Sequence, residues 1–185
     1  MRILGGSARS RRLTVPRGTT VRATAARVRE ALFNILAPLV AGSRFLDVFA
    51  GTGSVGLEAL SRGAGEACFI EANPRVLKVL RANVVRTAPD AAARIIAADA
   101  LHGLCLLASE GKIFDIIYID PPYGRGYEQR ALEIISSGCL LAPEGVCVVE
   151  TRKGDIPPER VGALVLYRSK RYGDTVLNFY RYEGR

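Results

Sequence analysis

Five short apolar segments alternate with segments of helical periodicity along the middle of this chain, and this alternation restricts the fold more than any other feature. The apolar segments cover residues 44–49, 67–71, 93–97, 114–120 and 146–150, and we expect helices at 24–36, 54–61, 74–84, 101–109 and 128–137. A strand that is apolar along its whole length is buried on both faces, as strands are in a parallel sheet covered by helices. The pattern predicts an α/β, Rossmann-like fold with a doubly wound, mostly parallel sheet.

The alternation stops after Glu150. Two further strand-like segments, 163–168 and 176–181, flank a turn at Tyr172-Gly173-Asp174 with no helix between them. Because consecutive strands joined without a crossover helix pair in antiparallel fashion, we expect a C-terminal hairpin. The hairpin brings the predicted sheet to seven strands.

The composition is that of one ordinary globular domain. At 185 residues, 49% of them hydrophobic, the chain is long enough for a proper core and short for two domains. It has no run of 18 apolar residues and no apolar N-terminal leader, so we expect a soluble, cytoplasmic protein without a membrane span.

The four cysteines lack Cys-x-x-Cys spacing and there is one histidine, so no metal site is expected. Cys68 and Cys147 lie within apolar strands, where a thiol is usually a small core residue.

The positive charge is concentrated at the N-terminus. Of the net charge of +8, residues 1–29 contribute eight arginines and no acid, while the other 18 basic residues are balanced by 18 acidic ones. Arginine makes planar, bidentate contacts with phosphate, so this excess favours contact with a nucleic acid over a solvated, flexible tail. Residues 3–6 and 13–16 are short apolar segments around Gly and Ser, which predict a small β-hairpin.

These features divide the chain into a basic N-terminal arm, residues 1–23, and a single Rossmann-like domain, residues 24–185. Thr24 can cap the first helix, and Arg27 and Arg29 fall off its apolar face, where they can extend the basic surface. The candidate nucleic-acid contacts are Arg2, Arg9, Arg11, Arg12, Arg22 and Arg27.

A glycine-rich turn follows the first predicted strand. Gly51, Gly53 and Gly56 have Gly-x-Gly-x-x-Gly spacing, which lets the backbone turn sharply and approach a ligand while the next helix presents free N–H groups. Glu71 ends the second strand 20 residues after Gly51, where an acid can accept hydrogen bonds from ribose hydroxyls. These features suit a dinucleotide or S-adenosylmethionine equally, and a plain strand-to-helix turn is the third interpretation.

Two acids favour the methyl donor. Asp47 lies inside the first strand, where its charge would face the sulfonium or amino group of the donor and would repel a pyrophosphate. Asp99 ends the third strand, placed to accept a hydrogen bond from an adenine amine. The predicted contacts with S-adenosylmethionine are Asp47, Ala50, Gly51, Thr52, Gly53, Glu71, Ala72, Asp99 and Ala100.

The most informative motif is Asp120-Pro121-Pro122-Tyr123, at the C-terminal end of the fourth predicted strand. An acid, two prolines and an aromatic ring at a sheet edge can hold a flat nitrogenous base that is flipped out of its helix. Hydride transfer has no evident use for these groups. The motif therefore predicts methyl transfer to an exocyclic amine, with an ordinary strand-ending turn as the alternative.

Several segments together resemble the RsmD family of bacterial 16S ribosomal RNA guanine-N2 methyltransferases. They are residues 1–6, 27–34, 47–64, 120–123 and 172–175, in the family's order and over nearly the whole chain. The resemblance implies a class I S-adenosylmethionine-dependent enzyme of the 16S rRNA guanine-966 N2 type, acting on an assembled or partly assembled small subunit. We expect it to be a monomer. The chain departs from the family over residues 21–26, where a proline and an acid are missing.

The same resemblance gives each residue of the tetrapeptide a role. The Asp120 carboxylate and the Pro121 carbonyl would accept hydrogen bonds from the guanine amine, Pro122 would fix the backbone, and Tyr123 would stack on the base. Three other functions stay open. An adenine-N6 methyltransferase acting on RNA or DNA would keep every site residue, a nucleotide-dependent oxidoreductase would bind NAD, and a non-catalytic RNA-binding assembly factor would bind RNA without transferring a methyl group.

Overall fold

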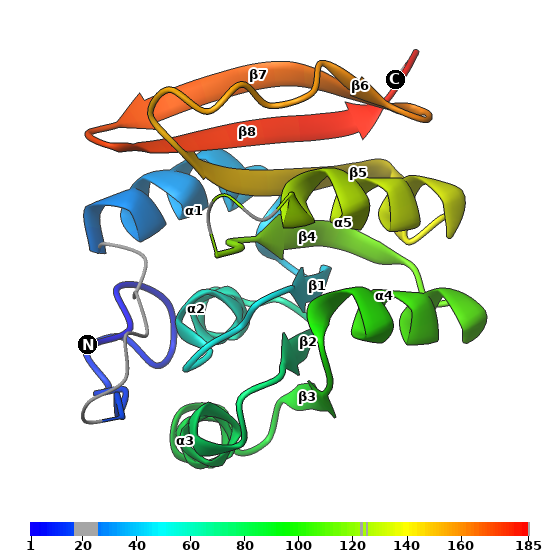
Figure 1. The fold of residues 1–185 in the computed structure, drawn as a ribbon. Helices are drawn as coiled ribbons and strands as arrows, with labels where there is room; N and C mark the ends of the chain where they lie inside the picture. The colour runs from blue at the N-terminus through cyan, green and yellow to red at the C-terminus, as the bar shows by residue number, and fades with distance from the viewer. Residues whose placement is uncertain (17–25, 123, 125, 185) are drawn as a thin grey trace.

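The computed structural model describes residues 1–16, 26–122, 124 and 126–184. Its middle layer is one sheet with the strand order β3-β2-β1-β4-β5-β8-β7-β6 (Figure 1). Its first five strands pair in parallel, and they are β1 (Arg44–Asp47), β2 (Glu66–Glu71), β3 (Ala92–Ala97), β4 (Phe114–Ile119) and β5 (Leu141–Arg152). The predicted α/β fold with a mostly parallel sheet is confirmed.

The C-terminal hairpin is also confirmed, and it carries one more strand than predicted. β7 (Leu164–Tyr172) and β8 (Thr175–Tyr182) pair antiparallel, and β8 adds antiparallel to β5. The edge strand β6 (Arg160–Val161) raises the number of strands in the described sheet from the predicted seven to eight. A strand of two residues is too short to leave an alternating pattern in the sequence.

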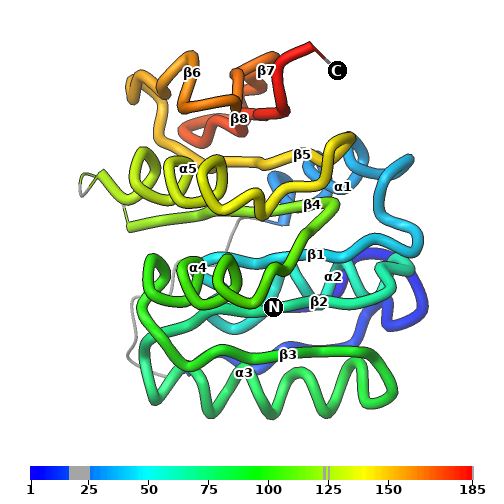
Figure 2. The backbone as a smooth tube through the Cα atoms, turned by 90° about the vertical axis from the view of Figure 1, so that its right-hand side faces the viewer, coloured from blue at the N-terminus to red at the C-terminus, as the bar shows by residue number. Residues whose placement is uncertain are grey.

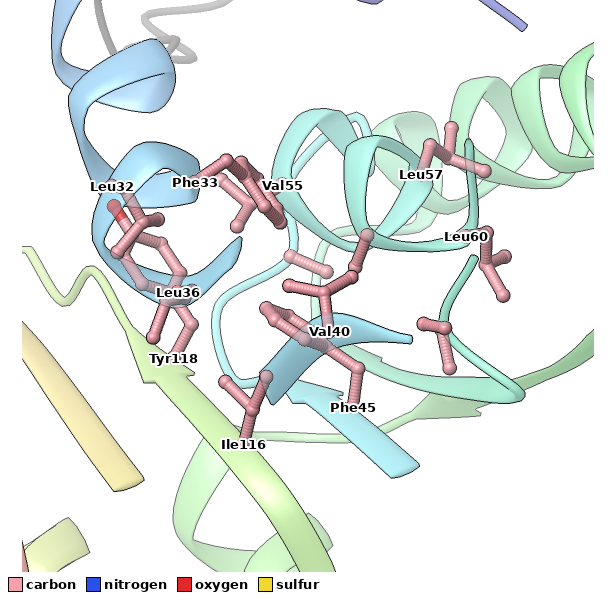
Figure 3. Close-up of a cluster of buried hydrophobic side chains, with 14 of the residues drawn as sticks. Leu32, Phe33, Leu36, Val40, Phe45, Val55, Leu57, Leu60, Ile116 and Tyr118 are labelled. Carbon is pink, nitrogen blue, oxygen red and sulfur yellow. The ribbon is translucent and has the colours of Figure 1, made fainter. Parts of the chain in front are cut away.

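Within the described residues, five helices cover the two faces of the sheet (Figure 2). Buried side chains of α1 (Ala26–Val40), α2 (Ser54–Ser61) and α3 (Pro74–Thr87) belong to one core cluster, and those of α4 (Ala100–Ser109) and α5 (Tyr127–Ser137) to the other. We call these the α1 face and the α5 face of the sheet. Figure 3 shows the first cluster, where Phe33 stacks on Phe45 with ring centroids 6.3 Å apart.

Most predicted boundaries lie within two residues of the observed ones. The end of α1 is wrong by four residues, because the helix continues through Pro38 to the buried Val40, and the expected cap Thr24 lies outside the described residues. The prediction for β5 was too short, because Leu141 already pairs with Phe114 of β4. The expected N-cap of α3 is present, since the Asn73 side chain accepts a hydrogen bond from the Arg75 N–H at 2.9 Å.

The N-terminal segment, residues 1–16, packs beside α2 and α3 (Figure 1). A single antiparallel bridge joins Arg2 to Arg12, so the predicted hairpin is reduced to one bridge within residues 1–16. Ile3 and Leu13 are buried in the core of the α1 face. A Cβ atom on Gly6, whose φ is +74°, would lie 1.7 Å from the Ser61 carbonyl oxygen, so only glycine permits this close approach.

A buried carboxylate attaches this segment to α2. Glu58 is fully buried, and its two oxygens accept hydrogen bonds from the backbone N–H groups of Leu4 and Gly5, both at 2.8 Å. Oε1 also accepts from Arg62 Nε at 2.8 Å. A buried charge is tolerated only when it is paired and hydrogen-bonded, and here backbone and side-chain donors together meet that requirement.

Arg29 completes the cluster, and the prediction that it extends the basic surface is wrong. Its side chain is 1% exposed, with Nε 3.5 Å from Glu58 Oε2 and Nη2 donating to the Arg2 carbonyl at 2.5 Å. Arg29 does lie off the apolar stripe of α1, but the N-terminal segment covers that side of the helix. Burial lowers the pKa of Arg29, and the neighbouring Glu58 carboxylate opposes this effect.

We expect Glu58→Ala to lower the free energy of unfolding by about 3–5 kcal/mol, because it leaves Arg29 buried without its counter-charge. Urea unfolding followed by circular dichroism measures the change. Glu30→Ala on the exposed side of α1 is the matched control and should change the free energy by about 0.5 kcal/mol or less. Similar small effects for both substitutions would contradict a structural role for Glu58.

Candidate cofactor and substrate site

The predicted site residues gather at one edge of the sheet. In a parallel sheet the carboxyl ends of the strands share an edge, and ligands of doubly wound folds bind there. Loops 48–53, 72–73, 98–99 and 120–122 follow β1, β2, β3 and β4 at this edge. Because β1 pairs directly with β4, the first and last of these loops start from neighbouring strands. We call this the carboxyl edge.

The glycine-rich loop has a tight, preformed backbone. Phe49, Gly51 and Gly53 all have positive φ, and the Gly53 N–H donates to the Ala50 carbonyl at 2.8 Å. A Cβ atom on Gly53 would lie 2.5 Å from Leu80 Cδ1 of α3, so a larger residue would push the loop off the helix. Contacts within the protein therefore fix the backbone of this loop.

Asp47 ties β1 to the first turn of α2. Its side chain is buried, and Oδ2 accepts a hydrogen bond from the Gly56 N–H at 2.9 Å. Burial raises the pKa of Asp47 to about 7; the Gly56 hydrogen bond opposes the rise and the Glu71 charge adds to it. The charged form of the Asp47 carboxyl is therefore costly in its buried position. A cation beside this carboxylate would offset the cost. The contact with a sulfonium or amino group stays a prediction.

Glu71 and the glycine-rich loop are brought together as the spacing predicts. Oε2 of Glu71 accepts from the Gly51 N–H at 2.9 Å, and Oε1 accepts from the Asn73 N–H at 2.7 Å. The partly exposed carboxylate therefore links the loop to the start of α3. Its position at the end of β2 keeps it available for the predicted contact with a ribose.

Asp99 has a structural role that the sequence analysis missed. Its Oδ1 accepts hydrogen bonds from the N–H groups of Leu101 at 3.0 Å and His102 at 3.4 Å, so it is the N-cap of α4. The signal was present, because an aspartate directly before a helical segment is a preferred cap. Among the other predicted contacts, the structure buries Ala50, Thr52 and Ala100 and exposes Ala72.

Asn83 of α3 connects the N-terminal segment to the glycine-rich loop, and no sequence signal marked it. Its side chain is fully buried and donates to the carbonyl oxygens of Thr14 at 3.1 Å and Thr52 at 3.0 Å. It also accepts from the Thr14 N–H at 2.9 Å. The amide thus holds two backbone segments that are remote in sequence in one fixed arrangement.

The tetrapeptide begins one residue after β4 ends. Asp120 is partly exposed, Pro121 is buried and Pro122 is exposed, while Tyr123 lies outside the described residues. Two residues earlier the buried Tyr118 hydroxyl donates to the buried carboxylate of Glu150 on β5. This hydrogen bond anchors the end of β4 and with it the start of the motif.

The candidate nucleic-acid contacts are exposed wherever the structure describes them. Arg2, Arg9, Arg12 and Arg27 form no ion pair with another described residue, and Arg11 donates from Nη1 to the Arg86 carbonyl at 2.9 Å. Arg22 lies outside the described residues. The arginines of the N-terminal segment are thus exposed on a segment that packs against the core of the α1 face.

Other kinds of site find little support in the described part of the chain. Cys68 and Cys147 are buried and unpaired, which confirms the prediction that they are core residues. No group of three or more metal-ligating side chains occurs among residues 1–16, 26–122, 124 and 126–184. Over the same residues, every helix is too short or too polar to span a bilayer.

The fold and this edge define the class of the protein. A doubly wound sheet that ends in an antiparallel hairpin, with a glycine-rich loop after β1, an acid at the end of β2 and Asp-Pro-Pro after β4, is a Rossmann-like methyltransferase.

Comparison with known proteins identifies the family. The family model described as "Conserved hypothetical protein 95" matches residues 1–181. Ribosomal RNA small subunit methyltransferase D of Escherichia coli K12 is 36% identical over 185 residues, which cover 100% of this chain and 91% of that protein. The chain belongs to the RsmD family, as its motifs predict.

Two solved structures share the whole fold. That of yhhF from Escherichia coli is 36% identical with a TM-score of 0.87, over 100% of this chain and 99% of that one. A hypothetical protein of Thermus thermophilus is 33% identical with a TM-score of 0.84, over 98% and 99% of the two chains. The similarity therefore includes the N-terminal segment and the C-terminal hairpin.

We expect Asp47→Asn to change how stability depends on pH. The pKa of Asp47 is raised by folding, so its favourable contribution is complete below about pH 4, the pKa of an unfolded aspartate, and is lost as the pH rises to about 7. Urea unfolding should therefore show that wild type loses about 1–3 kcal/mol relative to the variant between pH 5 and pH 8. Asp90→Asn, at an exposed aspartate, should run parallel to wild type. Parallel profiles for all three proteins would contradict the raised pKa.

Proposed function

We propose that this chain transfers a methyl group from S-adenosylmethionine to the exocyclic N2 amine of a guanine in 16S ribosomal RNA, at a site of the guanine-966 type. Membership in the RsmD family supports the activity of an rRNA methyltransferase. The choice of guanine N2 and of its position in the RNA is what we propose. The observation that carries it is the start of Asp120-Pro121-Pro122 beside the glycine-rich loop, from neighbouring strands β4 and β1 at the carboxyl edge.

The residues of the carboxyl edge fit S-adenosylmethionine better than a dinucleotide. Asp47, Glu71 and Asp99 supply carboxylates, and loops 48–53 and 72–73 contain no lysine or arginine. Carboxylates attract the sulfonium and amino cations of the donor and repel a pyrophosphate. Glu71 would hold the ribose, and the backbone of the glycine-rich loop would lie along the amino-acid part. This argument favours the donor over NAD.

The chain's own groups would act on the acceptor amine. When bound, S-adenosylmethionine supplies an electrophilic methyl group. The lone pair of guanine N2 is conjugated with the ring, and acceptors on its N–H groups make that pair more available. We assign this role to the Asp120 carboxylate and the Pro121 carbonyl, whose direction is restricted by the proline that follows. The proton released on methylation passes to Asp120 or to water.

Two supports hold these acceptors in place. Pro121 is buried, and the hydrogen bond from Tyr118 to Glu150 fixes the strand that leads to Asp120. Tyr123 would stack on the flipped-out base, a contact worth about 1–3 kcal/mol. The exposed arginines of the N-terminal segment would bind the RNA backbone near the same edge.

Asp120→Ala should retain the affinity for S-adenosylhomocysteine and reduce methyl transfer by about 100-fold or more, because it removes an acceptor of the amine protons. Calorimetry measures the first quantity, and transfer of labelled methyl groups to undermethylated small subunits measures the second. Asp90→Ala is the control. An active Asp120→Ala enzyme would remove Asp120 from the catalytic site.

The same assay decides the base. Nucleoside analysis of the labelled RNA should give N2-methylguanosine at one position. N6-methyladenosine would replace the guanine proposal with the adenine-N6 enzyme. RNA binding without any transferred methyl group would favour an assembly factor.

Replacing Arg9, Arg11 and Arg12 with alanine should weaken RNA binding while the affinity for S-adenosylhomocysteine stays unchanged. Loss of three phosphate contacts should flatten the slope of log affinity against log salt by roughly two. Filter binding over a series of salt concentrations measures the slope, and thermal unfolding checks that loss of the bond from Arg11 to Arg86 leaves the fold intact. An unchanged slope would show that these arginines are only solvated.

A further inference from the structure

The C-terminal hairpin presents cations on one face of the sheet. Paired residues of antiparallel strands point to the same face, and here Arg168 pairs with Phe179 and Lys170 with Leu177. Phe179 and Leu177 are buried in the core of the α1 face. Arg181 follows Phe179 by two residues and so shares that face.

These cations form a single-sign surface. We call Tyr167, Arg168, Lys170 and Arg181 the hairpin basic surface; all four are exposed. The α1 face of β7 and β8 includes no acidic residue, since the register places Val165, Tyr172, Thr175, Leu177 and Phe179 there with the three cations. In the described chain none of the three cations is paired with a carboxylate, whereas Arg44, Arg94 and Arg160 each have one.

Aromatic rings hold the two arginines in place. The Arg168 guanidinium lies 5.7 Å from the centroid of Phe179, and that of Arg181 lies 4.8 Å from the centroid of Tyr167. A guanidinium over the face of a ring is attracted by the π electrons of the ring, and its N–H groups can still donate to phosphate oxygens. The arginines are therefore partly ordered before a ligand arrives.

The hairpin also reaches the edge where the reaction would take place. Arg152, the last residue of β5, pairs with Thr175, and the Lys153 N–H donates to the Asp174 carbonyl at 2.8 Å. The β7–β8 turn therefore lies at the carboxyl edge, and Lys170 is close to that turn. Figure 1 shows this turn, the start of α1 and the N-terminal segment on the same side of the molecule.

We propose that the hairpin basic surface is a second RNA-binding surface, which acts together with the N-terminal arginines on the α1 face. The proposal rests on the proposed function, since it takes RNA as the substrate. A surface of cations without carboxylates attracts a polyanion, and arginines whose N–H groups can still donate match phosphate. RNA crossing the α1 face would meet the N-terminal segment on one side of α1 and the hairpin on the other.

The test is a triple variant, Arg168→Ala with Lys170→Ala and Arg181→Ala. Its affinity for small-subunit rRNA should fall about tenfold or more near physiological salt, and the slope of log affinity against log salt should flatten by roughly two. Its affinity for S-adenosylhomocysteine should equal that of wild type. Arg168→Lys with Arg181→Lys keeps the charge and should retain most of the slope, which separates charge from hairpin packing.

The matched control removes three charges elsewhere. Lys112 lies before β4, and Arg130 lies on α5. Arg171 directly follows Lys170 in β7 and therefore points to the opposite face of the sheet. All three side chains are exposed. The triple alanine variant of these residues should bind RNA like wild type. Thermal unfolding of both triple variants checks that the hairpin is intact.

The outcomes separate this inference from the proposed function. If wild type neither binds rRNA nor methylates it, the proposed function fails. If wild type does both and the hairpin variant matches the control, the hairpin basic surface is no RNA contact. If the hairpin variant loses affinity for small subunits but not for protein-free rRNA, the surface contacts a ribosomal protein and the RNA assignment is overturned.

Discussion

The buried carboxylate of Glu58 is the interaction that holds the other parts of the structure in position. It lies in α2, the helix that starts directly after the glycine-rich loop, and it accepts hydrogen bonds from Leu4 and Gly5 of the N-terminal segment. Arg29 of α1 supplies a buried counter-charge. Since an unpaired buried charge is far more costly than a paired one, the N-terminal segment, α1 and α2 are stable together and poorly stable apart. The position of the loop follows from that of α2.

Carboxylates also organise the carboxyl edge, through hydrogen bonds to backbone N–H groups. Asp47 binds Gly56, Glu71 binds Gly51, and Asp99 caps α4. The acids predicted to contact the donor thus also fix the backbone of the carboxyl edge. A site held in this way needs little reorganisation when a ligand binds, which lowers the cost of binding and of aligning the reacting groups. One consequence of this arrangement is that Asp47 is buried, and burial raises its pKa.

The same segments link the site to a basic face. Asn83 joins Thr14 of the N-terminal segment to Thr52 of the glycine-rich loop, so the surface that presents Arg9 and Arg12 is fixed relative to that loop. On the other side of α1, the hairpin basic surface starts near the carboxyl edge. A rigid base for both groups of cations suits a small rRNA methyltransferase, whose substrate is a large polyanion.

The amino-acid sequence was sufficient to predict the features that depend on near neighbours: the alternation of strands and helices, the glycine-rich turn, the Asn73 cap and the order of motifs that identifies the family. Periodicity, capping and turn chemistry act over a few residues and can be read locally. The three-dimensional arrangement was needed to show that Arg29 is buried, that Asp47 has a raised pKa, and that Arg168, Lys170 and Arg181 share a face. Burial depends on which distant segment covers a residue, and the shared face depends on strand register, so a segment of zero net charge can still present a positive surface.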